Sequence, residues 1–223
     1  MQDRLKRQLE FIVEVDKSKE ILRRTLLTQS KRRENDAEHA WHLALMAPIL
    51  KEYIKEDISA KCHACSAWHL ALMAPILKEY IKEDINITKV INMVIIHDLV
   101  EIDAGDTYCY DTEGYKTKET REKKAADRIF NILPKDQADF IYELWNEFEE
   151  METPESKYAN TLDRLQPILN NIATGGVSWK QNKTTKSMVL NRMKIIKDTS
   201  CELYNVVLEI INKGVKMGVL KDE

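Results

Sequence analysis

The stretch EHAWHLALMAPILKEYIKEDISAKCHACSAWHLALMAPILKEYIKEDI, Glu38 to Ile85, contains one helix-forming sequence twice. Residues 40–58 and 67–85 are identical letter for letter, and the eight residues 59–66 separate them. Each copy begins with a run that is apolar almost all round a helix, which is typical of a central, buried helix. The chain therefore holds two candidates for one buried position. Which copy fills that position decides where a functional site can form.

The rest of the chain predicts an all-α fold in one domain, residues 1–223. The chain has only six Gly and five Pro, and no alternating run typical of a strand. A length of 223 residues is enough to bury a substantial core. Besides the repeat, the expected helices are 3–16, 87–100, 116–132, 135–150, 154–173, 184–197 and 199–217.

Local signals set some of the expected boundaries. Asn35 or Asp36 is suited to cap the first copy, which should be helical from about 40 to 54. Pro48 and its counterpart Pro75 predict a kink in each copy. Gly175-Gly176 is expected to stop the helix before it.

Composition also limits the function. The net charge of −3 is well mixed along the chain, without the basic stripe that nucleic-acid binding requires. No apolar run is long enough for a membrane span, and the N-terminus does not resemble a signal peptide. The expected location is cytoplasmic. Two of the four cysteines lie in the 59–66 linker and the other two lie far apart, which argues against a disulfide framework.

Potential metal ligands and acid–base groups occur in four places: Glu38-His39, His97-Asp98, Glu101 with Asp106, and Asp163. Two imidazoles and two carboxylates would form a mixed nitrogen and oxygen site, suited to Mn, Fe, Co, Ni, Zn or Mg. A metal ion there would generate hydroxide near neutral pH and polarise a phosphoryl oxygen. Glu101 follows Asp98 by about one helical turn and could serve as general acid or base.

Each of these residues also has a structural interpretation. A lone histidine on an apolar helix is usually a hydrogen-bonded core residue, and an Asp-Arg pair such as Asp163-Arg164 is usually a surface ion pair. The combination favours a site. A buried His-Asp pair is followed by acidic residues and accompanied by a second histidine and a distant helical aspartate.

Three segments, RRENDAEHAWHLALMA, IHDLVEIDAGDTY and TLDRLQPILNN, strongly resemble the HD-domain metal-dependent phosphohydrolases. The nearest branch is similar to bacterial 5′-deoxynucleotidases, and the resemblance runs from about Phe11 to Asn171. It implies an all-α HD-domain bundle and the hydrolysis of a deoxynucleoside 5′-monophosphate to nucleoside and phosphate. Other HD proteins cleave cyclic nucleotides, guanosine tetraphosphate or nucleoside triphosphates, so the chemistry is better specified than the substrate.

The resemblance also assigns roles to residues. The implied metal ligands are His39, His97, Asp98 and Asp163. Glu101 would act on the attacking water, and Asp106 belongs to the Gly-Asp that follows it. An arginine that precedes the first ligand helix would contact the substrate phosphate. Arg23 is the best match, with Arg24 beside it.

The linker SAKCHACS has two interpretations. Cys62 and Cys65 have the spacing of half a zinc site, with His63 and His69 nearby, but no second cysteine pair matches them. Alternatively, the linker is inverted coding DNA. The reverse complement of codons for Glu38–Leu45, read one base out of frame, allows SAKCHACS at all eight positions. This interpretation makes 59–85 an insertion of 27 residues rather than an evolved repeat.

The residues that flank the two copies predict which copy is seated, that is, which one occupies the buried position in the core. The first copy follows His39, whereas the equivalent position before the second copy is Ser66. Metal binding would stabilise only the arrangement that includes His39. We therefore expect the first copy in the core, and 59–85 as an extra linker and helix. Its bare apolar face would pack on another chain and favour a homo-oligomer.

The alternative function is non-catalytic. The insertion would then leave a metal-binding or oligomerising helical protein without hydrolase activity.

Overall fold

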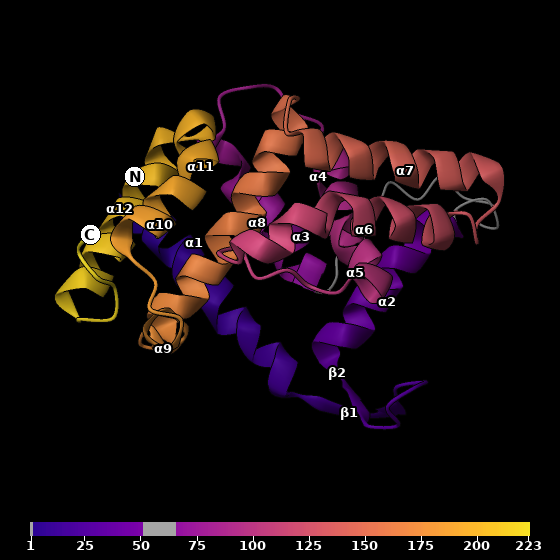
Figure 1. Ribbon diagram of the computed structural model, residues 1–223, viewed down its shortest axis with the longest axis horizontal. Helices are drawn as coiled ribbons and strands as arrows, with labels where there is room; N and C mark the ends of the chain where they lie inside the picture. The colour runs from indigo at the N-terminus through magenta and orange to yellow at the C-terminus, as the bar shows by residue number, and fades with distance from the viewer. Residues whose placement is uncertain (1, 51–65) are drawn as a thin grey trace.

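The protein is a bundle of helices with a small β-hairpin, formed within residues 22–35, that projects at an edge away from both chain termini (Figure 1). The computed structural model describes residues 2–50 and 66–223, so Cys62, His63 and Cys65 of the proposed zinc motif lie outside the described residues. Within the described ranges, no helix is both long and apolar enough to cross a membrane. The helical fold predicted from the sequence is confirmed.

Helix α8, Pro154–Ala173, runs through the middle of the bundle (Figure 1). It contributes fully buried side chains at helical spacing, among them Tyr158, Leu162 and Leu165. Helices α3, Ser66–Leu77, and α4, Ile87–Ile96, pack against it and against each other.

The remaining helices surround this centre. They are α1 Gln2–Val15, α2 Asp36–Ile49, α5 Glu101–Ala104, α6 Thr112–Phe130, α7 Lys135–Glu150, α9 Val177–Gln181, α10 Lys186–Arg192, α11 Lys194–Thr199 and α12 Cys201–Lys216. Short 3-10 turns follow α1 at Asp16–Glu20, α3 at Lys78–Tyr80 and α4 at His97–Val100.

The hairpin was not predicted. Strands β1, Leu22–Leu26, and β2, Arg33–Asn35, pair antiparallel, with Leu22 opposite Asn35. Asn35 then caps α2, because its side chain accepts from the Glu38 amide while the Glu38 side chain accepts from the Asn35 amide. The predicted cap is confirmed at Asn35. Helices α2 and α3 end within two residues of Pro48 and Pro75, where kinks were expected.

The expectation that the first copy fills the core is wrong. In the second copy, Met73 and Leu77 are completely buried and Leu70 is 5% exposed. Their counterparts in the first copy are Leu43, Met46 and Leu50, which are 43%, 42% and 39% exposed. Helix α3 therefore occupies the central groove. Helix α2 packs outside it, against α3 and α4.

Contacts on both sides of the groove hold α3 in place. The Tyr158 hydroxyl donates to the carbonyl of Ala74 over 2.7 Å, and the Gln8 side chain donates to the carbonyl of Ile76 over 3.1 Å. After α3 the chain runs directly into α4 and buries Tyr80, Ile81 and Ile85 on the way.

This connection gives the physical reason for the correction. The apolar sequences of the two copies are identical, so their own burial cannot choose between them. Only the second copy continues without an excursion into α4, and it buries Tyr80, Ile81 and Ile85 before α4 begins. The N-terminal flanks, where His39 lies, predicted the other copy because they carry no information on this C-terminal continuity.

Candidate active site

His97 is the centre of the candidate site. It is the first residue of the 3-10 turn after α4, and its ring is buried against Phe148, with ring centroids 4.6 Å apart. Its Nδ1 lies 3.0 Å from the carbonyl oxygen of Val94, which fits an Nδ1–H donor. The hydrogen bond leaves Nε2 as the nitrogen that faces the rest of the site.

Two carboxylates face Nε2 of His97. Oδ1 of Asp98 lies 3.0 Å away, and Oδ1 of Asp163, from the central helix α8, lies 3.5 Å away. Nε2 is buried and has no hydrogen-bond partner of good geometry in the described part of the chain. The structure thus brings together three of the four ligands that the resemblance implied.

Charge and burial shift the pKa values at this centre. Burial alone would lower the pKa of His97, but the charges of Asp98 and Asp163 outweigh it and raise that pKa to about 9. Burial raises the pKa of Glu101 to about 7, with the charges of Asp98 and Asp106 acting in the same direction. Shifts of this kind are typical of functional sites.

A cavity of about 540 Å³ contains these groups. His97, Asp98 and Asp163 line it together with Glu101 and Asp106, as the sequence predicted. Lys118 is also in its wall, where its ammonium lies 2.7 Å from Glu122 and 3.7 Å from Glu149. Five of the predicted site residues therefore share one cavity.

His39 and Arg23 are not brought to this cavity. Nδ1 of His39 lies 3.4 Å from Oε2 of the buried Glu34, in the β-hairpin. Arg23 lies 3.7 Å from the same oxygen and donates to Asp36 over 3.0 Å. The predicted fourth ligand and the predicted phosphate contact thus share an ion-pair cluster on the outer helix and hairpin.

The displacement of α2 explains this result. Helix α2 packs against the outer side of α4, where the indole of Trp41 donates to the carbonyl of Ile95 over 3.4 Å. Between them is a separate cavity of about 350 Å³, lined by Glu38 and Trp41 on one side and His97 and Asp98 on the other. Helix α2 therefore places Glu38 in the wall of a cavity that His97 also lines, while His39 lies against Glu34.

A divalent metal ion fits these donors only in part. The unpartnered Nε2 of His97, with two carboxylates beside it, is the donor arrangement that a metal would use. Nevertheless, across residues 2–50 and 66–223 no three His, Cys, Asp or Glu side chains are grouped so that they could hold one ion. The ligand set that the resemblance implies is incomplete while His39 lies outside the cavity.

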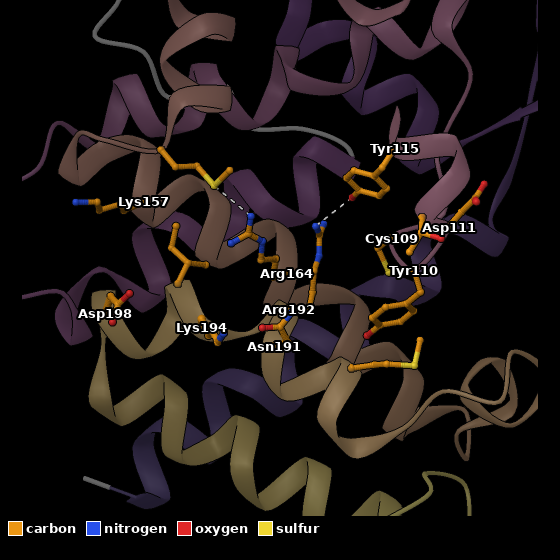
Figure 2. Close-up of a pocket in the computed structure, with 14 residues that line it drawn as sticks. Cys109, Tyr110, Asp111, Tyr115, Lys157, Arg164, Asn191, Arg192, Lys194 and Asp198 are labelled. Atoms are coloured by element: carbon orange, nitrogen blue, oxygen red, sulfur yellow. Dashed lines mark hydrogen bonds between the residues drawn. The ribbon is translucent and has the colours of Figure 1, made fainter. Parts of the chain in front are cut away.

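The sequence did not single out two arginines that lie beside this centre. Arg164 follows Asp163 on α8, and Arg192 ends α10. Both line the cavity of His97 and also an adjoining cavity of about 1010 Å³, shown in Figure 2. A surface ion pair is the structural alternative for Asp163-Arg164 in the sequence, and no local signal distinguishes Arg192. Only the fold places it near Asp163.

These arginines are close enough to repel each other. Burial lowers the pKa of Arg164, and the positive charge of Arg192 lowers it further. Arg192 lies 4.0 Å from Asp163 through Nη2, and its Nη1 donates to the Tyr115 hydroxyl over 3.3 Å. The pair thus places positive charge at the edge of an acidic centre.

Comparison with solved structures supports the same fold. The crystal structure of a predicted metal-dependent phosphohydrolase from Magnetospirillum magnetotacticum MS-1 is 41% identical and has a TM-score of 0.66. The match covers 98% of this chain and 96% of that one.

Curated relatives match over a shorter stretch. The 5′-deoxynucleotidase HDDC2 of Mus musculus is 33% identical over 84 residues, which are 38% of this chain and 42% of that protein. The Homo sapiens protein of the same name is 32% identical over 84 residues. The chain thus spans less than half the length of these curated relatives.

The family described as HD domain matches this chain over residues 15–65 and 66–204. The two matched segments meet between the copies, so each contains one of the duplicate helices. Together they cover most of the chain. This protein therefore belongs to the HD-domain family of phosphohydrolases.

Proposed function

We propose that this chain is a metal-dependent phosphohydrolase that hydrolyses deoxynucleoside 5′-monophosphates to nucleoside and phosphate. One observation carries the proposal: His97, Asp98 and Asp163 converge in a cavity that also contains Glu101 and Asp106. The partial match to relatives named 5′-deoxynucleotidase supports the substrate class.

The metal in this proposal is divalent, namely Mn, Co, Mg, Fe, Ni or Zn, because the donors are imidazole and carboxylate. When bound, such an ion makes water more acidic and polarises a phosphoryl oxygen. His97, Asp98 and Asp163 would hold it. Glu101, with its pKa near neutrality, would take the proton from the attacking water at its carboxylate.

The position of His39 favours a second candidate. With His39 against Glu34, the ligand set lacks one of its four members, and the full chain would then be a metal-binding or oligomerising helical protein with little catalysis. Removing one copy of the repeat distinguishes these possibilities, because either deletion below forces the remaining helix into the groove.

Two deletions provide a matched pair. Removing 59–85 retains the first copy after His39, and removing 39–65 retains the second copy after Ser66. Since the copies are identical, the two products have the same length and differ only by His or Ser at position 39. Any difference between them reports the contribution of that imidazole.

The test measures phosphate release from the four deoxynucleoside 5′-monophosphates with Mn²⁺, Co²⁺ or Mg²⁺. We expect the highest activity from the 59–85 deletion, little from the 39–65 deletion and weak activity from the full chain. Activity only in the 59–85 deletion would support the second candidate for the full chain. If none of the three proteins releases phosphate, the proposed substrate class is wrong.

A further inference from the structure

Arg164 and Arg192 meet where two cavities join. The cavity of about 540 Å³ holds His97 and the acidic residues, and the cavity of about 1010 Å³ opens on the other side of the arginines. Figure 2 shows both side chains extending into the larger cavity, from α8 and α10 respectively. Six residues line both cavities, so the two form one continuous cleft: Cys109, Tyr110, Tyr115, Met151, Arg164 and Arg192.

The hydrogen bonds of Arg164 leave much of its donor capacity unused. Its Nη2 contacts Sδ of Met151 at 3.1 Å and Oδ1 of Asn160 at 3.3 Å, and both acceptors are uncharged. Its Nε is buried and has no hydrogen-bond partner in the described part of the chain. A guanidinium carries five N–H donors and retains its charge, so Arg164 holds buried donors that an anion could use.

Arg192 is also only weakly engaged. Its hydrogen bond to Tyr115 is 3.3 Å long, and its approach to Asp163 is 4.0 Å. Elsewhere in this chain, arginines bind carboxylates through two nitrogens, as Arg128 does with Asp103 through Nε and Nη2. Such bidentate pairs satisfy a guanidinium far better than the contacts of Arg192 do.

We propose that Arg164 and Arg192 together bind the phosphate group of the substrate. This inference rests on the proposed function and names the residues that recognise the phosphate group of its substrate. Two neighbouring guanidiniums repel each other unless an anion lies between them, and phosphate oxygens match their geometry. Arg23, the contact implied by the family resemblance, is instead tied to Glu34 and Asp36.

The location of the pair also orients the rest of the substrate. Because Arg192 is 4.0 Å from Asp163, a phosphate held by the pair lies next to the His97 centre. The nucleoside then extends into the larger cavity, which Tyr110, Tyr115 and Asn191 line. Aromatic rings can stack on a base and an amide can bond its edge. A volume of about 1010 Å³ is sufficient for a nucleoside.

A binding experiment with paired ligands tests the proposal without turnover. The probes are a deoxynucleoside 5′-methylenephosphonate, which keeps the charge but cannot be hydrolysed, and the same deoxynucleoside without a phosphonate. Calorimetric titrations of the full chain use each probe with and without Mn²⁺. The proteins are wild type, Arg192→Gln, Arg164→Gln, Arg192→Lys and the control Lys197→Gln, which alters an exposed lysine of α11 that lines neither cavity.

We expect wild type to bind the phosphonate more tightly than the nucleoside. Arg192→Gln and Arg164→Gln should each weaken phosphonate binding by about 10- to 100-fold, the range for hydrogen bonds to a charged group, and leave nucleoside binding unchanged. Arg192→Lys should retain part of the affinity, since a lysine supplies charge without the planar fork. Lys197→Gln should change either affinity by less than about threefold.

Thermal unfolding identifies any variant that fails to fold, and Arg192 is the safer probe because its own contacts are weak. Unchanged phosphonate binding in Arg192→Gln would overturn the proposal, as would equal loss for both probes. The two proposals fail separately. Arginine-dependent binding without phosphate release from any deoxynucleotide refutes the hydrolase proposal alone, whereas phosphate release with unchanged binding in the variants refutes the arginine pair alone.

Discussion

His42 and His69 hold the same position in two identical stretches of sequence, yet His42 is exposed and His69 is completely buried. Nε2 of His69 hydrogen-bonds the carbonyl of Ile12 in α1, and its Nδ1 lies 3.3 Å from Asp16 and 3.4 Å from Gln166. The same contrast extends along both helices. The duplication thus provides an internal control for each test of which copy is seated.

The first prediction uses a pair of methionines. Met73 is fully buried, whereas its counterpart Met46 is 42% exposed. Met73→Ala should lower the free energy of unfolding by about 2–5 kcal/mol through lost burial and a cavity. Met46→Ala should change it by less than about 0.5 kcal/mol. Urea unfolding measures both. The reverse order of effects would mean that the first copy occupies the groove.

Much of the fold was predictable because the local signals for helix starts and ends agree with the pattern of buried side chains. Helices α7 and α8 have the predicted bounds, and the side chain of Thr153 accepts from the amide of Ser156 at the start of α8. The hairpin was missed because β1 is exposed at nearly every position and so has no alternating apolar pattern.

The seated copy could not be predicted from propensity, because the two sequences are the same. It depends on which copy is covalently continuous with α4, a property of the whole fold. The positions of the candidate site residues also depend on which helices lie in the core. His97, Asp98 and Asp163 lie on the core helix α8 or directly after the core helix α4, and they meet as expected. His39 lies outside their cavity, because it belongs to α2, which packs outside the central groove.

The second prediction concerns pH. Burial lowers the pKa of His69 below its ordinary value of 6.5. The unfolded chain therefore takes up a proton at this residue more readily than the folded one, and the stability from neutral His69 is present above pH 6.5 and lost as pH falls below it. His69→Gln, which keeps a side-chain hydrogen-bonding group, should flatten the decline in stability between pH 7.5 and 5.

Denaturant unfolding across this pH range measures the effect. His42→Gln is the matched control, since the same residue is exposed in the first copy. It should reproduce the wild-type pH profile. A wild-type decline in His69→Gln would assign the pH dependence to other groups.

The third prediction concerns self-association. Helix α2 exposes Leu43, Met46 and Leu50, large apolar side chains on the copy that is not seated. Such a face favours contact with a second chain. The double change Leu43→Gln with Met46→Gln should shift the protein toward monomer in sedimentation velocity at micromolar concentration. Because both side chains are exposed, folding should be retained. An unchanged distribution of species would exclude this face as the interface.

The last prediction isolates the imidazole that this fold displaces. In the full chain His39 lies against Glu34, apart from His97, Asp98 and Asp163. Deleting 59–85 restores His39 to the flank of the only remaining helix, and deleting 39–65 puts serine there. Calorimetric titration with Mn²⁺ should show at least about tenfold tighter binding for the first deletion, since one ligand is gained. The full chain should resemble the second deletion.

His97→Ala in the 59–85 deletion is the control for this measurement, and it should abolish the high-affinity binding. Equal Mn²⁺ affinity in the two deletions would show that His39 is not a ligand. Affinity in the full chain equal to that of the 59–85 deletion would show instead that metal draws the first copy into the groove. The first comparison is specific to the imidazole, because the two deletions differ only in the residue that precedes the seated helix.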